Sequence, residues 1–353
     1  MSSPAPVNIG GVMVGDDYPT VLMAEIGTFF NSDLELARSY ILRCHEAGAP
    51  VLKTEIVHDP EIVLKNTGLN HTFRHANGSK TEDYRALMER KVVPLEGYRA
   101  LFGLCHELGM PVVASVYDLD GIDFFVDAGG AGIKIARNNI NNVPLIRHAA
   151  QTGLPIIFDA GVVYFDEVAR AVRLAQYEGA GGVIVTHHPG ANPAPPENHN
   201  MRIMQTYRQA LNIPVGFTCH HVGDEFLYMS VGMGANIIEK GVDIDPTRVE
   251  QDLITAASLD ELPDIVRKVR NCWLGLGGVP GKFAEPRDLS VRAGLVAKRA
   301  IAQGASLTLE NVRFSWPPVG ISAEQWDLID GRSASRDFSA GEPIGWNDVC
   351  FQS

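Results

Sequence analysis

Short apolar runs alternate with longer stretches of helical spacing along the first 280 residues of the chain. Short apolar runs bounded by Gly or Pro are typical of buried strands, and strands that alternate with helices build parallel sheets. The eight predicted strands cover residues 21–27, 50–56, 111–118, 132–137, 155–161, 182–188, 214–221 and 236–242. Eight strand–helix units predict an α/β fold of the (β/α)8 TIM-barrel type. A doubly wound open sheet is the alternative, and the count of eight and the short connections favour the barrel.

Helix boundaries and one long connection refine this picture. The helix predicted over residues 32–48 begins with Ser32 or Asp33 as its N-cap and ends at Gly48. The connection over residues 58–94 is longer than typical loops of such folds, so we interpret it as a lid or a substrate loop.

The composition of the sequence changes after Gly278, where a Gly- and Pro-rich stretch predicts a linker. Beyond it, residues 296–312 and 333–349 form an internal repeat, with a basic residue, a small-residue turn and an Asn/Asp ending at equal spacing. We predict a barrel domain over residues 1–280, and a linker with a small β-rich, pseudo-symmetric domain over residues 281–353. Because the core of so small a domain is thin, we expect it to dock onto the barrel or a partner subunit.

Composition excludes several classes of function. The formal net charge of −12 argues against a broad surface for nucleic acid or anionic membrane. No apolar run is long enough to span a bilayer, and the N-terminal residues do not resemble a secretory signal. The five cysteines are scattered and form no CxxC motif, so we expect reduced thiols in a cytoplasmic protein.

Ionisable and polar residues stand at the carboxyl end of every predicted strand. They are Glu25, Lys53, Glu55, Ser115, Asp118, Lys134, Arg137, Asp159, His187, His188, Cys219, His220, His221, Glu239 and Lys240. A barrel carries its chemistry at this end, and charged groups inside apolar strands are costly unless they are paired or functional. The pattern predicts a functional cavity at the mouth of the barrel.

Two lysines of this set, Lys53 and Lys134, lie within strands and should point into the mouth. Two ammonium groups in a low-dielectric cavity suit a phosphate or carboxylate ligand. Each lysine could instead pair with a neighbour such as Glu25 or Glu55, and both arrangements hold if carboxylates occupy an empty anion site. A lysine that forms a Schiff base is a third interpretation that spacing leaves open.

The paired histidines follow the alternation of a strand, which lets only one of each pair face the mouth. We expect His220 to face the mouth and His221 to face outward, with His187 as a weaker candidate for the mouth. The reverse choice in each pair stays open at this point, as does divalent-metal binding.

Several stretches resemble the N-acetylneuraminate (sialic acid) synthase family. They include "AEIG", "AGAPVLKTE", "GIKIARNNINNVPLIRHAAQTGLPIIFDAG", "PAPPENHNMR", "PVGFTCHH" and "GANIIEKG". The segment from Gly294 to Val349 resembles the antifreeze-like (SAF) domain of that family. The resemblance covers nearly the whole chain and implies a barrel, a linker and a SAF domain exchanged between the subunits of a homodimer.

The resemblance also implies an activity. The family condenses phosphoenolpyruvate with an N-acylated aminosugar, helped by a divalent metal, Mn or Mg. Matching motifs place Glu25 and Glu239 on acidic catalytic residues of the family, and His220 on a catalytic residue that is a metal ligand. The phosphoenolpyruvate site would comprise Lys53, Ser115, Lys134, Arg137, Asp159 and Thr218, and the acceptor site Asn192 and Trp316, with His187 as a second metal candidate.

Departures from the family's motifs gather on the metal and acceptor sides. Gly241 stands where the family has its second histidine ligand, and residues 29–32 read "FFNS" in place of "NHNG". Trp316 replaces an arginine that reaches the N-acyl group, so a fork of donors becomes a flat apolar face. The metal site therefore either weakens or shifts to His187, His188, His221 or Glu239.

These departures lead to two expectations about ligands. The acceptor should differ from N-acetylmannosamine and be smaller, less polar or aromatic. Asp159 would repel a phosphate unless Arg137 offsets it, so we expect these two side chains to pair across neighbouring strands. The alternatives are a barrel enzyme that acts as an aldolase, isomerase or decarboxylase on a related keto acid, and a non-catalytic homologue that binds a sugar acid.

Overall fold

The chain divides into two compact units, Met1–Leu276 and Gly277–Ser353. The computed structural model describes residues 3–278 and 290–351. The predicted domain boundary after residue 280 and the predicted linker over residues 281–289 lie outside the described residues. Each unit is presented separately below.

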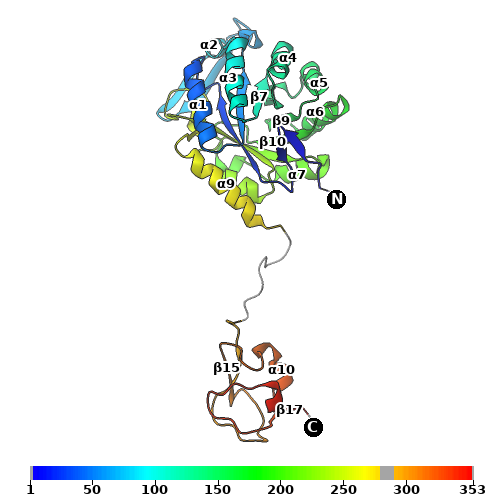
Figure 1. The fold of residues 1–353 in the computed structure, drawn as a ribbon. Coiled ribbons are helices and arrows are strands. Elements are labelled where there is room, and N and C mark those ends of the chain that lie inside the picture. The colour runs from blue at the N-terminus through cyan, green and yellow to red at the C-terminus, as the bar shows by residue number, and fades with distance from the viewer. Residues whose placement is uncertain (1–2, 279–289, 352–353) are drawn as a thin grey trace. The chain divides into compact units, whose positions relative to one another are not determined.

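The eight predicted strands all form, and they line the centre of the first unit (Figure 1). They are β3 (Val21–Gly27), β4 (Val51–Ile56), β7 (Val112–Val116), β8 (Gly132–Ile135), β9 (Ile156–Gly161), β10 (Val183–His188), β11 (Val215–Cys219) and β12 (Ile237–Asp243).

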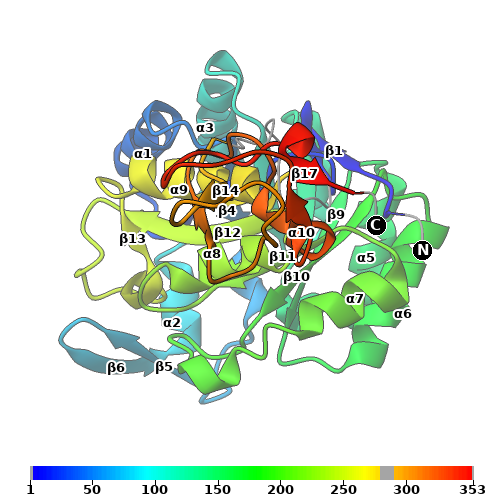
Figure 2. The same cartoon turned by 90° about the horizontal axis from the view of Figure 1, so that it is seen from below.

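Every neighbouring pair of these strands is parallel, and β12 pairs with β3 to close the barrel. In that seam Glu239 lies opposite Met23, and Gly241 lies opposite Glu25. A closed ring of eight parallel strands is a (β/α)8 barrel, which confirms that prediction and shows that the open-sheet alternative is wrong. Figure 2 shows the strands inside the ring of helices.

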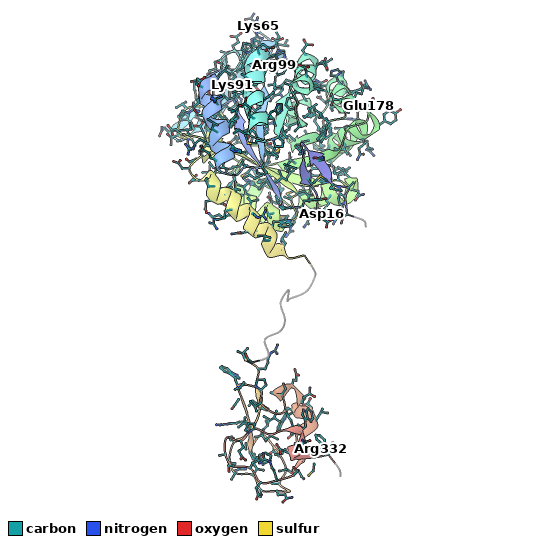
Figure 3. The ribbon with its side chains drawn as sticks, viewed as in Figure 1. Asp16, Lys65, Lys91, Arg99, Glu178 and Arg332 are labelled. Atoms are coloured by element: carbon teal, nitrogen blue, oxygen red, sulfur yellow. The ribbon has the colours of Figure 1, made fainter. Side chains whose placement is uncertain are left out.

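Eight helices surround the barrel, because each has one apolar face to bury against the strands. They are α1 (Leu34–Glu46), α3 (Leu95–Glu107), α4 (Leu119–Asp127), α5 (Val143–Gln151), α6 (Phe165–Tyr177), α7 (Ile203–Leu211), α8 (Glu225–Gly232) and α9 (Leu262–Leu276). Of the two N-cap candidates for α1, Asp33 is used, and its side chain accepts a hydrogen bond from Leu36 N at 3.0 Å. Arg147 of α5 donates to Glu178, labelled in Figure 3 just beyond α6, at 2.8 Å.

A short hairpin packs against the amino ends of the barrel strands. It consists of β1 (Val7–Ile9) and β2 (Val12–Val14), and its Val7, Ile9 and Val14 are at most 4% exposed. These side chains share one apolar cluster with the first inward residues of the strands, including Val51, Val113 and Ile157. The hairpin buries the apolar lower layer of the barrel, so polar layers are confined to the opposite end.

The long connection over residues 58–94 is structured. It contains a 3-10 turn η1 (Pro60–Ile62), the antiparallel strands β5 (Asn70–His75) and β6 (Gly78–Asp83), and the helix α2 (Tyr84–Glu89). The β5–β6 hairpin projects beyond the ring of helices in Figure 2. Shorter elements of the first unit are η2 (Arg137–Asn139), η3 (Pro196–Asn198), η4 (Leu253–Thr255) and β13 (Ala257–Ser258).

The second unit has little regular structure and a symmetric core. Its elements are β14 (Gly294–Ala297), β15 (Val312–Ser315), η5 (Ala323–Gln325), α10 (Trp326–Ile329), β16 (Ser333–Ala334), η6 (Trp346–Asp348) and β17 (Val349–Cys350). Ile301 and Phe338 hold equivalent places in the two copies of the sequence repeat, and they bridge each other. The bridge of Val296 with Pro343 is likewise repeated as that of Ser333 with Ser306.

Equivalent positions of the two repeats also fill the core of this unit. The buried pairs are Ala297 with Ala334, Ile301 with Phe338, Leu307 with Ile344, and Val312 with Val349. The two copies thus pair back to back and supply matching side chains, as the repeat in the sequence indicates.

Two further expectations concern membrane-spanning segments and the cysteine thiols. Within residues 3–278 and 290–351, no helix combines the length and apolarity that crossing a membrane requires. All five cysteines are free thiols, and Cys44, Cys105 and Cys219 are buried.

Candidate functional site

A cavity of about 1070 Å³ opens at the carboxyl ends of the barrel strands. The inward side chains of the strands form its floor, and the segment over residues 58–94 forms one wall. Ten of the predicted site residues line it, namely Glu25, Lys53, Ser115, Lys134, Arg137, Asp159, Asn192, Thr218, His220 and Glu239.

Lys53 occupies one side of the floor, between carboxylates of its own and the adjacent strand. Its side chain is 2% exposed, and its Nζ donates to Glu25 and, at 3.2 Å, to Glu55 Oε1. The strand register places Glu25 opposite Lys53 on β3 and β4. Tyr117 donates to the other oxygen of Glu55 at 2.9 Å, which holds that carboxylate in place.

Lys134 gathers a second set of groups from across the barrel. Its Nζ lies 2.7 and 2.8 Å from the two carboxylate oxygens of Glu239 on β12. Asp159 on β9 lies 3.4 Å from the same nitrogen, and Thr218 Oγ1 on β11 lies 3.5 Å from it. Carboxylates therefore surround both ammonium groups, the arrangement expected if they hold the place of an anionic ligand.

Charge compensation decides the protonation of both lysines. Burial disfavours the charge of Lys53, but Glu25 and Glu55 outweigh it and raise the pKa of Lys53 well above its usual value. Burial likewise opposes the charge of Lys134, and Asp159 and Glu239 raise its pKa. A Schiff-base lysine needs a lowered pKa, so this interpretation is disfavoured for both residues.

Glu25 titrates close to neutrality. Burial raises its pKa to about 7, the charge of Lys53 opposes this rise only in part, and Glu239 adds repulsion. Glu25 can therefore hold or release a proton in the cavity at physiological pH.

This shift has a measurable consequence for stability. In the window between the ordinary value of 4.5 and about 7, folded Glu25 retains a proton that the unfolded chain releases. Rising pH through that window therefore favours unfolding. We expect the free energy of unfolding of the wild type to fall relative to that of Glu25→Gln between pH 5 and pH 7, and to change little below 4.5. Urea unfolding of both proteins across this range measures the difference, and parallel curves would contradict it.

In each of the two histidine pairs, one residue lines the cavity and the other does not. His188 and His220 line the cavity, with ring centroids 4.1 Å apart and ring planes at 69°. His187 lies on the outward face of β10, where its Nε2 contacts the carbonyl oxygen of His199. The expectation that His187 lies beside His220 in the mouth is therefore wrong. His221 faces outward as expected, and its Nε2 lies 2.8 Å from Glu225. Alternation is the physical reason, because Ile184, Thr186 and His188 share the inward face of β10.

His188 and His220 are both neutral at physiological pH. Burial, reinforced by the charge of Arg137, lowers the pKa of His188 well below its usual value. Burial and the adjacent His188 lower the pKa of His220 in the same way. Nδ1 of His188 accepts a hydrogen bond from Gly190 N at 2.8 Å, which leaves its proton on Nε2. Nδ1 of His220 is buried without a hydrogen-bond partner.

The donor set does not fit the divalent metal that the resemblance implies. Catalytic metal sites commonly use three protein ligands. In the described portion of the chain, no three His, Cys, Asp or Glu side chains are arranged to hold a metal ion. Gly241 offers no ligand, and a Cβ built on it would lie 3.5 Å from the ring of Phe29.

Three remaining predicted residues have other partners or surroundings. Arg137 donates to the carbonyl oxygen of Gly190 at 2.6 Å, and Asp159 pairs with Lys134. The expected pair of Arg137 with Asp159 therefore does not form. Arg137 is the first residue of η2, and its guanidinium lies beside Gly190 instead. Asn192 donates to Asp252 at 2.6 Å. Trp316 belongs to the second unit, and its side chain is 78% exposed.

Sequence reasoning missed several residues that line the cavity. They are Leu64, Leu69, His71, Tyr84, Lys91, Tyr117 and Asp252. Five of them come from the 58–94 connection, whose length was the available signal. Asp252 has a φ of +68°, a conformation that is uncommon outside Gly, Asn and Asp, and nothing in its local sequence indicates it.

Comparison with known families gives two matches. The model of the NeuB family matches residues 40–280, and the model of the SAF domain matches residues 292–349.

Similar proteins share nearly the whole chain. The N,N'-diacetyllegionaminic acid synthase of Legionella pneumophila is 26% identical over 95% of this chain and 96% of its own. The N-acetylneuraminate-9-phosphate synthase of Homo sapiens is 25% identical over 85% of this chain and 84% of its own. A solved structure of sialic acid synthetase from Leptospira borgpetersenii superposes with a TM-score of 0.71, at 22% identity, over 80% of this chain and 93% of that one.

Proposed function

This chain belongs to the NeuB family, and on that premise we propose that it condenses phosphoenolpyruvate with an aldehyde to give a 2-keto-3-deoxy acid. The relatives whose names state an activity are sugar-acid synthases, which supports a transferase that forms a carbon–carbon bond.

The single observation that carries the proposal is the pair of lysines in one cavity. Lys53 and Lys134 are each at most 2% exposed, and both stay charged because carboxylates surround them. Desolvated ammonium groups bind a dianion strongly, and a phosphate or carboxylate can replace the carboxylates that now contact them.

The reaction balances with one water molecule. C3 of phosphoenolpyruvate attacks the aldehyde carbon, and the aldehyde oxygen takes up a proton. Water adds at C2, the bond from C2 to the phosphate oxygen breaks, and inorganic phosphate leaves. Glu25 is placed to move a proton in this sequence, since it lines the cavity and its pKa is about 7.

The acceptor should carry a substituent that is less polar than the N-acetyl group of N-acetylmannosamine. The cavity wall presents Phe29 together with Leu64 and Leu69, which are 72% and 51% exposed. Asn192 and the half-buried carboxylate of Asp252 supply polar contacts beside this wall. We propose an acceptor that combines hydroxyl groups for the polar side with an apolar or aromatic group for the wall.

Phosphate release tests the proposal directly. The full chain is mixed with phosphoenolpyruvate and a panel of aldehydes, including N-acetylmannosamine and sugars with apolar substituents. We expect aldehyde-dependent phosphate release, and a product whose mass equals phosphoenolpyruvate plus aldehyde plus water less phosphoric acid. Phosphate release without any aldehyde would be hydrolysis of phosphoenolpyruvate and would contradict the condensation, whereas cleavage of a keto acid would favour the aldolase alternative.

Assembly and location remain predictions. The resemblance implies a homodimer that exchanges SAF domains, and sedimentation equilibrium would give its mass. The expected cytoplasmic location is likewise a prediction.

A further inference from the structure

The side chain of Phe29 fills the space beside Gly241. Gly241 is an inward residue near the end of β12, opposite Glu25 on β3. A Cβ at this position would contact two ring carbons of Phe29 at 3.5 Å and the Cβ of Ala256 at 3.6 Å. A Cβ alone would therefore fit, but the rest of a larger side chain would meet the aromatic ring.

Phe29 is a fixed part of the structure. Its side chain is 5% exposed and belongs to the main hydrophobic cluster of the barrel. Its backbone N–H bonds to the carbonyl oxygen of Ile26 at 3.1 Å, and its own carbonyl oxygen accepts from Arg248 at 3.1 Å. Because the loop is anchored on both sides of the ring, the ring is expected to stay beside Gly241.

His188 and His220, two of the three histidines that line the cavity, do not make up for the missing ligand. The third, His71, lies on β5, where its ring packs against Tyr84 with centroids 5.3 Å apart. Nδ1 of His188 is already occupied by Gly190 N–H at 2.8 Å. A metal needs lone pairs from several side chains converging at about 2.0–2.2 Å, whereas the two rings stand edge to face with centroids 4.1 Å apart. The carboxylates of Asp159 and Glu239 are committed to Lys134.

We propose that this protein works without a bound divalent metal, because the ring of Phe29 occupies the volume that a second imidazole ligand at position 241 would need. The inference rests on the proposed condensation only for its catalytic consequence, namely that chelators leave turnover unchanged. The binding consequence stands on the geometry of Phe29, Gly241, His188 and His220.

Manganese binding tests the proposal without turnover. The full-length protein is freed of metal by a chelator, and binding of Mn²⁺ is followed by electron paramagnetic resonance. We expect no specific binding by the wild type up to about 1 mM Mn²⁺, the weak end of protein sites for hard cations.

Variants identify the cause. The double variant Phe29→Ala/Gly241→His removes the ring and adds an imidazole, and we expect it to bind Mn²⁺ at least about 10-fold more tightly than the wild type. Gly241→His with Phe29 retained, and Phe29→Ala with Gly241 retained, should each bind no better than the wild type. Adding His220→Ala to the double variant should abolish the gain. Circular dichroism confirms that each variant is folded before it is compared.

The results separate this inference from the proposed function. Tight, stoichiometric Mn²⁺ binding by the wild type that His220→Ala removes would overturn the inference. Phosphate release that requires added Mn²⁺ would also overturn it while leaving the condensation intact. Release that persists in chelator supports both. If no aldehyde gives release under either condition and Mn²⁺ does not bind, the proposed condensation fails and the conclusion about the metal stands.

Discussion

Replacing Lys134 by Met is expected to weaken the binding of phosphoenolpyruvate by at least about 100-fold, since truncating one partner of a buried charge pair costs several kcal/mol. Lys134 is 2% exposed and is the ammonium group that Asp159, Thr218 and Glu239 surround. Without it, the carboxylates would repel the dianion. Isothermal calorimetry at fixed ionic strength measures the loss.

The same change should also destabilise the fold, and a second variant separates the two effects. Removing one partner of a buried ion pair costs about 3–5 kcal/mol, because the other charge stays buried and unpaired. The double variant Lys134→Met/Glu239→Gln removes the unpaired charge of Glu239, so it should regain much of this stability and still fail to bind. Lys268→Met is the matched control, since Lys268 lies on α9 and is 44% exposed. Unchanged affinity in a folded Lys134→Met protein would refute the assignment of the anion site.

Replacing Gly216 by Ala is expected to destabilise the barrel by about 3 kcal/mol, the upper range of overpacking effects. Gly216 lies on β11, where an added Cβ would come 2.3 Å from the backbone oxygen of Ile237 and 2.6 Å from its Cγ2. The contact is with backbone, which has no free space to move into in a closed barrel. The added Cβ can therefore be accommodated only if β11 and β12 separate. Urea unfolding followed by far-ultraviolet circular dichroism measures the change.

A glycine on the outer layer provides the control for that experiment. Gly103 lies inside α3, and nothing stands within 4 Å of the Cβ that Ala would add. Gly103→Ala should therefore stabilise the protein by about 0.5–1 kcal/mol through helix propensity. Equal midpoints for Gly216→Ala and the wild type would show that the close approach of β11 and β12 is relaxed in solution.

Much of the fold follows from local patterns. All eight strands lie where the apolar runs predict them, and α1 begins at the predicted Asp33 cap. The hairpin within residues 58–94 was not predicted, although Asn77–Gly78 is a common hairpin signal. A charged, exposed hairpin lacks the apolar alternation by which buried strands are recognised.

The candidate site was predicted in part, and the errors have two causes. Strands of a parallel barrel are buried on both faces, so their hydrophobic pattern does not tell which residues point inward. The sequence therefore did not fix which of His187 and His188 points inward; we expected His187, and the inward face of β10 belongs to His188. Likewise Arg137 was expected beside Asp159, but it follows β8 on a turn that directs it to Gly190.

The sequence by itself determined the ring of eight strands, the two buried lysines and the paired repeats of the second unit. Each of these features can be read from local patterns: the periodicity of single strands, the residues at their ends, and the spacing within each repeat copy. Only the tertiary structure decided which histidine faces the cavity, that Lys134 contacts Glu239 from across the barrel, and that Phe29 fills the space beside Gly241. The last two features depend on contacts between residues more than 100 positions apart, whose distances are fixed by closure of the barrel and packing of its core.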